Sequence, residues 1–197
     1  MNKFETLRSV LKLNSNPIGV KLIYDYHEDT VVDSIFTEAN KKNKYCDFVK
    51  KASEGEFLKI QKGDFSCNTA DMALGFQNFN NLELNMRLDI MGLKYILLFP
   101  INKYLVEDYD SIILILNPHN CMNIIQAYVR LYKKPLKITC GIISGVCSEV
   151  TAYVIKRNEV NFSFLCTESR KNGVYSDCEI LCGIPAKKID DLIESLI

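Results

Sequence analysis

The sequence predicts one compact domain over residues 1–197, of the α/β or α+β class, in which helices pack on a mixed sheet. Three observations lead to this prediction. Short apolar runs with strand character alternate with amphipathic runs of helical period. No linker-like stretch separates two parts of the chain. A chain of 197 residues, 48% of them hydrophobic, can bury one core of ordinary size.

The first part of the chain is expected to start with a helix at Phe4–Leu13, because apolar residues recur there at helical spacing. Ile18–Ile23 is expected to be a strand, and Tyr95–Phe99 a buried strand that ends at Pro100. Between these two strands, the pattern predicts helices at Thr30–Asn40, Cys46–Ser53 and Asn68–Leu74, the last capped by Gly75, and a strand at Phe57–Ile60.

In the second part, Ser111–Leu116 has the clearest strand pattern, because it is apolar and rich in β-branched residues. Asn120–Leu131 has the clearest helical pattern and is followed by Pro135, which ends it. The remaining expected elements are strands at Leu136–Ile143 and Val160–Leu165, a helical run at Ser148–Val154 and a terminal amphipathic helix at Ile189–Ile197.

Two pairs of cysteines resemble each other in spacing and surroundings. Cys46 and Cys67 are 21 positions apart, and Cys147 and Cys166 are 19 apart. In each pair a helical run follows the first cysteine, a turn with a glutamate and a short strand come next, and the second cysteine opens another helical run. This similarity predicts an internal repeat of about 18–100 and 111–197, whose two pseudo-symmetric halves bring four thiols to one site.

Four thiolates suit a zinc ion or a [4Fe–4S] cluster. Cys67 and Cys166 are each expected at the start of a helix, where backbone N–H groups favour the thiolate. No C-x-x-C knuckle is present, so the spacing does not separate zinc from iron–sulfur. We expect Cys46, Cys67, Cys147 and Cys166 to be the metal ligands, with an iron–sulfur cluster favoured because the cysteines are far apart in the chain.

A cluster would imply a redox or electron-transfer role, with a redox partner protein and self-association into a homo-oligomer both open. Two other readings also remain open. The first is a structural zinc protein that acts as an interaction module. The second is a small-molecule-binding or enzymatic domain in which the cysteines are only core residues and the strand-to-helix corner near His119 forms the pocket. Because the chain has no Walker A loop, G-x-G-x-x-G, G-x-S-x-G or H-E-x-x-H motif, no familiar enzyme class is indicated.

Other polar residues near the cysteines have two interpretations each. Arg170 could offset the negative charge of a thiolate-bound cluster, which makes it a candidate cofactor-binding residue, or it could be solvated. Glu149 could accept a hydrogen bond beside the metal site, but an exposed acid in a first helical turn is favoured. Of the two histidines, His27 and His119, the second could act as a base at its strand-to-helix corner, but a turn histidine is favoured there.

The other four cysteines are expected in the core, since a free cysteine packs as a small hydrophobic residue. Cys121 and Cys140 are assigned to this group on that ground. Cys178 and Cys182 are four positions apart, and an apolar face of one helix would hold both.

Charge and hydropathy argue against two classes of partner. The chain has 24 basic and 24 acidic side chains and no dense basic stripe, so no nucleic-acid partner is expected. The longest apolar runs are far too short to span a bilayer, so no membrane partner is expected either. Met1–Leu13 is amphipathic and unlike a signal peptide, and a cytoplasmic location is therefore expected.

Several motifs along the chain resemble a known family. They are Pro17-Ile18-Gly19-Val20-Lys21, Tyr45-Cys46, Cys67 with Ala70 and Leu74-Gly75, Asn117-Pro118 with Gln126-Ala127, Val146-Cys147-Ser148-Glu149, Cys166 with Ser169-Arg170, and Gly183-Ile184-Pro185. In this order they resemble the uncharacterised domain of unknown function 169 (ArCR), found in archaea and anaerobic bacteria. The resemblance implies cysteines at the four positions named above and implies no established reaction. Asn68 and Glu168 depart from the family's usual residues.

Overall fold

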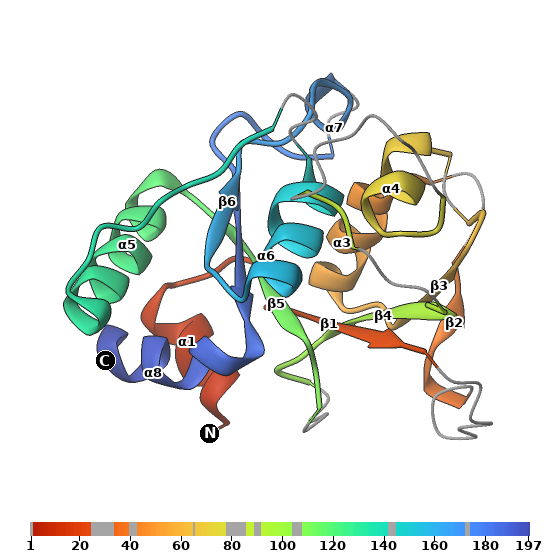
Figure 1. The fold of residues 1–197 in the computed structure, drawn as a ribbon. Coiled ribbons are helices and arrows are strands. Elements are labelled where there is room, and N and C mark those ends of the chain that lie inside the picture. The colour runs from red at the N-terminus through yellow and green to blue at the C-terminus, as the bar shows by residue number, and fades with distance from the viewer. Residues whose placement is uncertain are drawn as a thin grey trace.

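One mixed β-sheet runs through the centre of the molecule, and helices cover both of its faces (Figure 1). This computed structural model describes residues 2–24, 34–39, 43–64, 66–77, 86–88, 92–103, 108–141, 145–171 and 174–197. Over those residues the strands are β1 (Ile18–Ile23), β2 (Thr37–Glu38), β3 (Leu58–Gln61), β4 (Tyr95–Pro100), β5 (Ser111–Leu116), β6 (Asn161–Ser163) and β7 (Ile180–Pro185). They lie in the order β2-β3-β4-β1-β5-β7-β6, with β2 and β3 parallel and the other neighbours antiparallel. The predicted α/β class and single compact domain are confirmed.

The helices bury two apolar cores, one on each face of the sheet. One face carries α3 (Tyr45–Glu54), α4 (Asn68–Ala73) and a π-helix, η2 (Ser148–Ala152), that continues into α6 (Tyr153–Arg157). The other face carries α1 (Lys3–Val10), α5 (Pro118–Tyr132) and α8 (Ala186–Leu196). Strand residues alternate between the cores, as the pleat requires: in β4, Ile96 and Leu98 face the first core, and Leu97 and Phe99 face the second. Among the described residues, no helix combines the length and the apolar character needed to cross a bilayer.

The two sides of the sheet repeat the same strand order and register. The strands β3, β4 and β1 lie on one side and β6, β7 and β5 on the other, while β1 and β5 meet antiparallel in the middle. The pair Ile18–Pro100 on one side corresponds to Ser111–Pro185 on the other. The helical segments around the outer strands follow the same order, α3 and α4 in the first half and η2–α6 and α7 (Thr167–Lys171) in the second, where α5 is inserted between β5 and η2. The cysteine-bearing segments of the two halves therefore start from corresponding places in the sheet.

Several strands and helices form where the hydrophobic pattern predicts them. The strands β1 and β5 have the predicted bounds, and α5 and α8 extend the predicted helices by a few residues. The helix predicted at Thr30–Asn40 does not reach its predicted end, because Thr37–Glu38 forms β2; residues 30–33 and 40 lie outside the described part of the chain.

Two predictions in the second half are wrong. Residues 136–141, the described part of the strand predicted at Leu136–Ile143, form no strand. The side chain of Asn161 takes the place of a backbone partner there, accepting from the Thr139 N–H at 2.9 Å and donating to the Thr139 carbonyl at 2.8 Å. Cys178 and Cys182 do not share a helix face, because Cys178 lies in a turn and Cys182 in β7.

Candidate metal centre

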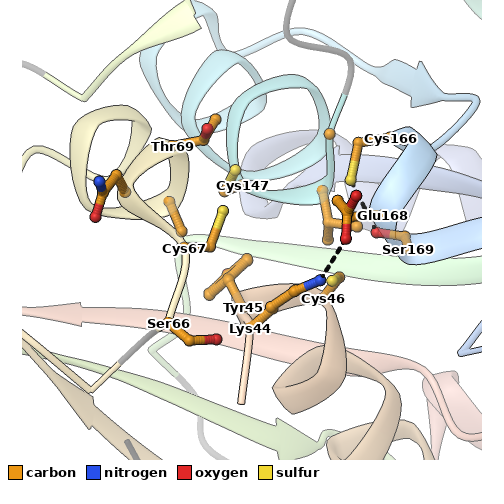
Figure 2. Close-up of a pocket in the computed structure, with 14 residues that line it drawn as sticks. Lys44, Tyr45, Cys46, Ser66, Cys67, Thr69, Cys147, Cys166, Glu168 and Ser169 are labelled. Carbon is orange, nitrogen blue, oxygen red and sulfur yellow. Dashed lines mark hydrogen bonds and ion pairs between the residues drawn. The ribbon is translucent and has the colours of Figure 1, made fainter. Parts of the chain in front are cut away.

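Four cysteine side chains line a single cavity of about 420 Å³ on the α3–α4 face of the sheet (Figure 2). They are the four expected ligands, Cys46, Cys67, Cys147 and Cys166. Cys46 and Cys67 come from the β1–β3–β4 half, and the other two come from the β5–β6–β7 half. The cavity is therefore built by residues far apart in sequence, and neither half could form it alone.

Each cysteine lies at the beginning of a helical segment. Cys46 is in the first turn of α3, and Cys67 is the N-cap residue of α4. Cys147 is the N-cap residue of η2, and Cys166 directly precedes α7. The first N–H groups of a helix lack partners within it, and they favour negative charge nearby. In both halves, then, the local backbone suits a sulfur that becomes a thiolate.

The two halves also distribute burial in the same way. Cys46 and Cys147, the first cysteine of each pair, are each 7% exposed, whereas Cys67 and Cys166 are half-buried. The cavity thus has two sulfurs in its wall and two nearer its rim.

Burial sets the protonation of the two inner thiols. It raises the pKa of Cys46 to about 11, against a hydrogen bond from Ser169 that lowers it. Burial likewise raises the pKa of Cys147, and repulsion from the neighbouring Cys67, Cys46 and Cys166 raises that pKa further. The four sulfurs are therefore close enough to interact electrostatically, and the inner two are neutral thiols at pH 7 in the absence of a compensating cation.

Ser169 is a site residue that the sequence analysis did not single out. Its side chain is 1% exposed, its hydroxyl lies 3.1 Å from the sulfur of Cys166, and it is near enough to Cys46 to lower the pKa of that thiol. It joins a buried cysteine of one half to a rim cysteine of the other. The family motif Ser169-Arg170 could have drawn attention to it, but only the fold places its hydroxyl between two thiols.

An ion pair crosses the mouth of the cavity. The Lys44 ammonium lies 3.0 Å from the Glu168 carboxylate, and both residues line the cavity (Figure 2). Lys44 precedes α3 in one half and Glu168 belongs to α7 in the other, so the pair links the halves at the opening. The Glu168 side chain is 61% exposed, which leaves the pair accessible to solvent.

The structure does not bring Arg170 to this cavity. Its guanidinium donates to the backbone carbonyls of Phe164 (2.9 Å from Nη2), Glu179 (3.0 Å) and Ser176. Tyr175 donates to the Cys46 carbonyl at 2.9 Å in the same region. Arg170 therefore fixes the chain that runs from Cys166 towards β7 and lines no part of the cavity itself.

Glu149 is not the exposed first-turn acid that was favoured. It is 0% exposed, and its Oε1 accepts from the Gly141 N–H at 3.1 Å. It does not line the cavity either. Its carboxylate holds the chain that leads into η2.

The remaining cysteines and histidines divide differently from expectation. Cys121 and Cys182 are buried in the core on the α5 face, as expected. Cys140 and Cys178 are exposed, so their assignment to the core is wrong; Cys140 lies in an irregular segment and Cys178 in a turn. His119 is exposed in the first turn of α5 and lies outside the four-cysteine cavity, and His27 falls outside the described residues.

The donor set can be compared with the groups that cysteines hold. Among the described residues, no three His, Cys, Asp or Glu side chains converge on a position for one metal ion. Four thiols around one cavity nevertheless fit a cluster that takes one thiolate on each of its irons. The residues present thus fit an iron–sulfur cluster.

The fold and the site define an α/β protein with a four-cysteine cavity between two similar halves. Residues 6–87 and 79–195 match the family described as uncharacterised ArCR, domain of unknown function 169. The chain belongs to this family, as the sequence motifs predicted. No curated protein and no solved structure matched the chain.

Proposed function

We propose that this protein holds an iron–sulfur cluster of the [4Fe–4S] type and has a redox or electron-transfer role. The observation that carries the proposal is the cavity of about 420 Å³ with four cysteines in its lining, two from each half. Cys46, Cys67, Cys147 and Cys166 would hold the cluster. When bound, such a cluster supplies a redox centre whose potential depends on the hydrogen bonds to its sulfurs and on its exposure to solvent.

The arrangement of the sulfurs supports a cluster over a single ion. A zinc ion needs its four donors within about 2.0–2.3 Å of one point. A [4Fe–4S] cluster instead has its ligand sulfurs around a larger body, which suits donors that line a cavity without meeting at its centre. The cavity volume also falls in the range of about 300–1,000 Å³ that is usual for bound small molecules.

The protonation of the thiols gives the site a defined pH behaviour. Cys46 and Cys147 are raised in pKa by burial, so each must lose a proton before it can bind iron. Loading therefore releases protons, and it weakens as the pH falls. The Ser169 hydroxyl, already beside Cys166, is placed to hydrogen-bond the thiolate that forms.

A redox partner protein would approach at the rim, where the Lys44–Glu168 pair is open to solvent.

All eight cysteines, each within the described residues, are free thiols. Free thiols in this number are typical of a reducing compartment, and the cytoplasm is accordingly the proposed location.

The test is purification without oxygen, followed by iron and acid-labile sulfide analysis and a visible absorption spectrum. We expect about four irons and about four sulfides per chain and a broad visible absorption. Stoichiometric zinc without sulfide would select the structural zinc module instead. A colourless protein without either metal would refute both.

Two matched variants connect the metal to the cavity. Cys147→Ser removes a buried ligand and should abolish stoichiometric iron, while Cys178→Ser alters an exposed cysteine outside the four-cysteine cavity and should retain it. If Cys147→Ser and Cys166→Ser both keep their iron content, the cysteines are not the ligands. The reading as a small-molecule-binding domain would then be favoured.

A further inference from the structure

A second cavity, of about 630 Å³, opens where the ends of α1, α3 and β5 meet the turn before β7. None of the four proposed metal ligands lines it. Basic side chains outnumber acidic ones in its lining: Arg8, Lys12, Lys50 and Lys103 against Glu54 and Glu179. Because the whole chain has a formal net charge of zero, this cavity is a local concentration of positive charge.

Three of the four cations have no counter-ion among the residues that the structure describes. Over the described part of the chain, the side chains of Arg8, Lys12 and Lys103 form no hydrogen bond or ion pair. Arg8 is only half exposed, and it belongs to the last turn of α1. Charges of one sign in a concave site with low-dielectric walls focus the electric field and attract ions of the opposite sign. The cavity therefore favours an anion.

The fourth cation already holds a carboxylate. Lys50 lies 3.2 Å from Glu179, and it also sits 5.4 Å from the centre of the Tyr175 ring. Glu179 is held in turn by the Ser176 N–H, which donates to its Oε2 at 2.7 Å. The Glu179 carboxylate, an oxyanion of the protein itself, thus lines the same cavity as the unpaired cations.

Buried amides make the walls rigid. Asn16 donates to the Ser53 carbonyl at 2.9 Å, and Asn120 donates to the Leu11 carbonyl at 2.8 Å. Both amides are almost fully buried, and both line the cavity. They tie the chain after α1, which carries Lys12, to α3 and α5.

We propose that this cavity binds a small molecule that carries an oxyanion, either a carboxylate or a phosphate, with Arg8, Lys12 and Lys103 as its cationic contacts. Arginine matches both groups because its guanidinium donates paired hydrogen bonds to two oxygens. The volume fits a small organic ligand. This site is separate from the proposed cluster and does not depend on it.

The test is calorimetric titration of the purified chain with inorganic phosphate and with succinate, in low salt. At least one probe should bind with one site per chain, and added potassium chloride should weaken it. Binding of phosphate alone assigns a phosphate ligand, and binding of succinate alone assigns a carboxylate ligand. If neither probe binds at millimolar concentration, the proposal is wrong.

Charge variants identify the contacts. Arg8→Gln and Lys103→Gln should each weaken binding about tenfold or more, as expected for loss of a charge-assisted hydrogen bond. Lys137→Gln makes the same change of charge at an exposed residue that does not line the cavity, and it should leave the affinity unchanged. Equal losses in Arg8→Gln and Lys137→Gln would show only a general effect of net charge and would overturn the proposal.

A variant of opposite sign completes the test. Glu179→Gln keeps an acceptor for the Ser176 N–H but removes the carboxylate that competes for Lys50. Anion binding should therefore become tighter in this variant. An unchanged or weaker affinity, with unfolding curves like those of the wild type, would place the anion elsewhere.

Discussion

The two halves of this protein share a strand register but stabilise their cysteine-bearing helices by different means. Two residues after Cys46 the first half has Phe48, which is 1% exposed in an apolar core. Two residues after Cys147 the second half has Glu149, which is 0% exposed and accepts from the Gly141 N–H. One half uses apolar packing at this position and the other a polar contact, so corresponding positions in the two helical segments do not require the same side-chain chemistry.

The helices themselves differ in the same way. The first half has a regular α-helix, whose first turn is capped by the Asp47 carboxylate accepting from the Lys44 N–H at 2.7 Å. The second half starts with η2, in which the Thr151 hydroxyl donates to the Val146 carbonyl at 2.9 Å. π-helical turns are uncommon and are frequent at functional sites. The irregular helix is the one that follows Cys147, whereas the regular helix contains Cys46, and both thiols are buried to the same extent.

The largest expected effect is at Phe48, in the half that uses apolar packing after its first cysteine. Phe48→Ala should lower the free energy of unfolding by about 3–5 kcal/mol, because it removes a buried ring and leaves a cavity. Urea unfolding followed by circular dichroism would measure it. Phe164→Ala, at a residue 53% exposed, is the control and should change stability little. A loss of similar size in the control would mean that burial does not explain the difference.

Gly183 should be the next most sensitive position. An added Cβ there would lie 2.4 Å from the Val150 carbonyl oxygen, which is backbone of η2. Gly183→Ala should therefore cost roughly 2–3 kcal/mol, at the upper end of the range for overpacking. At Gly19 the close atoms belong to the Phe99 side chain and not to backbone, so Gly19→Ala should cost less. Unfolding curves that rank the two variants in reverse would contradict this account.

The second half should lose stability when the Glu149 carboxylate, the acceptor for the Gly141 N–H, is removed. Glu149→Leu replaces the carboxylate with an apolar side chain of similar size and leaves the Gly141 N–H without its partner, at a cost of roughly 1–2 kcal/mol. Glu149→Gln retains an acceptor and should cost less. Denaturant titration of both variants checks the order. Equal stability of the two would show that the hydrogen bond contributes nothing.

The smallest expected effect lies at the junction of the halves, where Asp110 precedes β5 and Pro17 precedes β1. The Asp110 carboxylate accepts from the Leu22 N–H at 2.7 Å, and burial raises its pKa above the usual value. A carboxyl whose pKa is raised on folding favours the folded state at low pH, and that contribution is lost as the pH rises through the folded pKa.

The stability of the wild type relative to Asp110→Asn should therefore fall as the pH is raised from about 4, the ordinary pKa of an aspartate, towards neutrality. Thermal unfolding of both proteins across this range measures the difference. A wild type that gains on the variant as the pH rises would reverse the sign and refute the role given to burial.

Local patterns predicted much of the fold. β1 and β5 were predictable because a short apolar run between chain-breaking residues is typical of a buried strand. β7 was missed, since Cys182 and Gly183 weaken its strand pattern and its partners lie far away in sequence. The false strand at 136–141 shows the converse: the residues have strand character, but the side chain of Asn161 takes the hydrogen bonds of Thr139.

The four cysteines of the candidate site were predictable because the two pairs have similar spacing in the sequence. Cys46 and Cys147 stand out with their partners because the same succession of expected elements follows the first cysteine of each pair. Nothing local indicated that Arg170 would bind backbone carbonyls, or that Ser169 would stand between two thiols. The cavity around Arg8 was equally hidden, because its walls come from segments separated along most of the chain.

By itself, the sequence indicated the family through its motifs, and it indicated the α/β class and the four cysteines worth considering through periodicity and spacing along the chain. Only the tertiary structure decided that those cysteines line one cavity, that Glu149 is buried and that a cationic cavity lies elsewhere. The physical reason is that β1 and β5 pair across about half the length of the chain. Contacts of that kind arise from the packing of the two halves and leave no mark in any short stretch of residues.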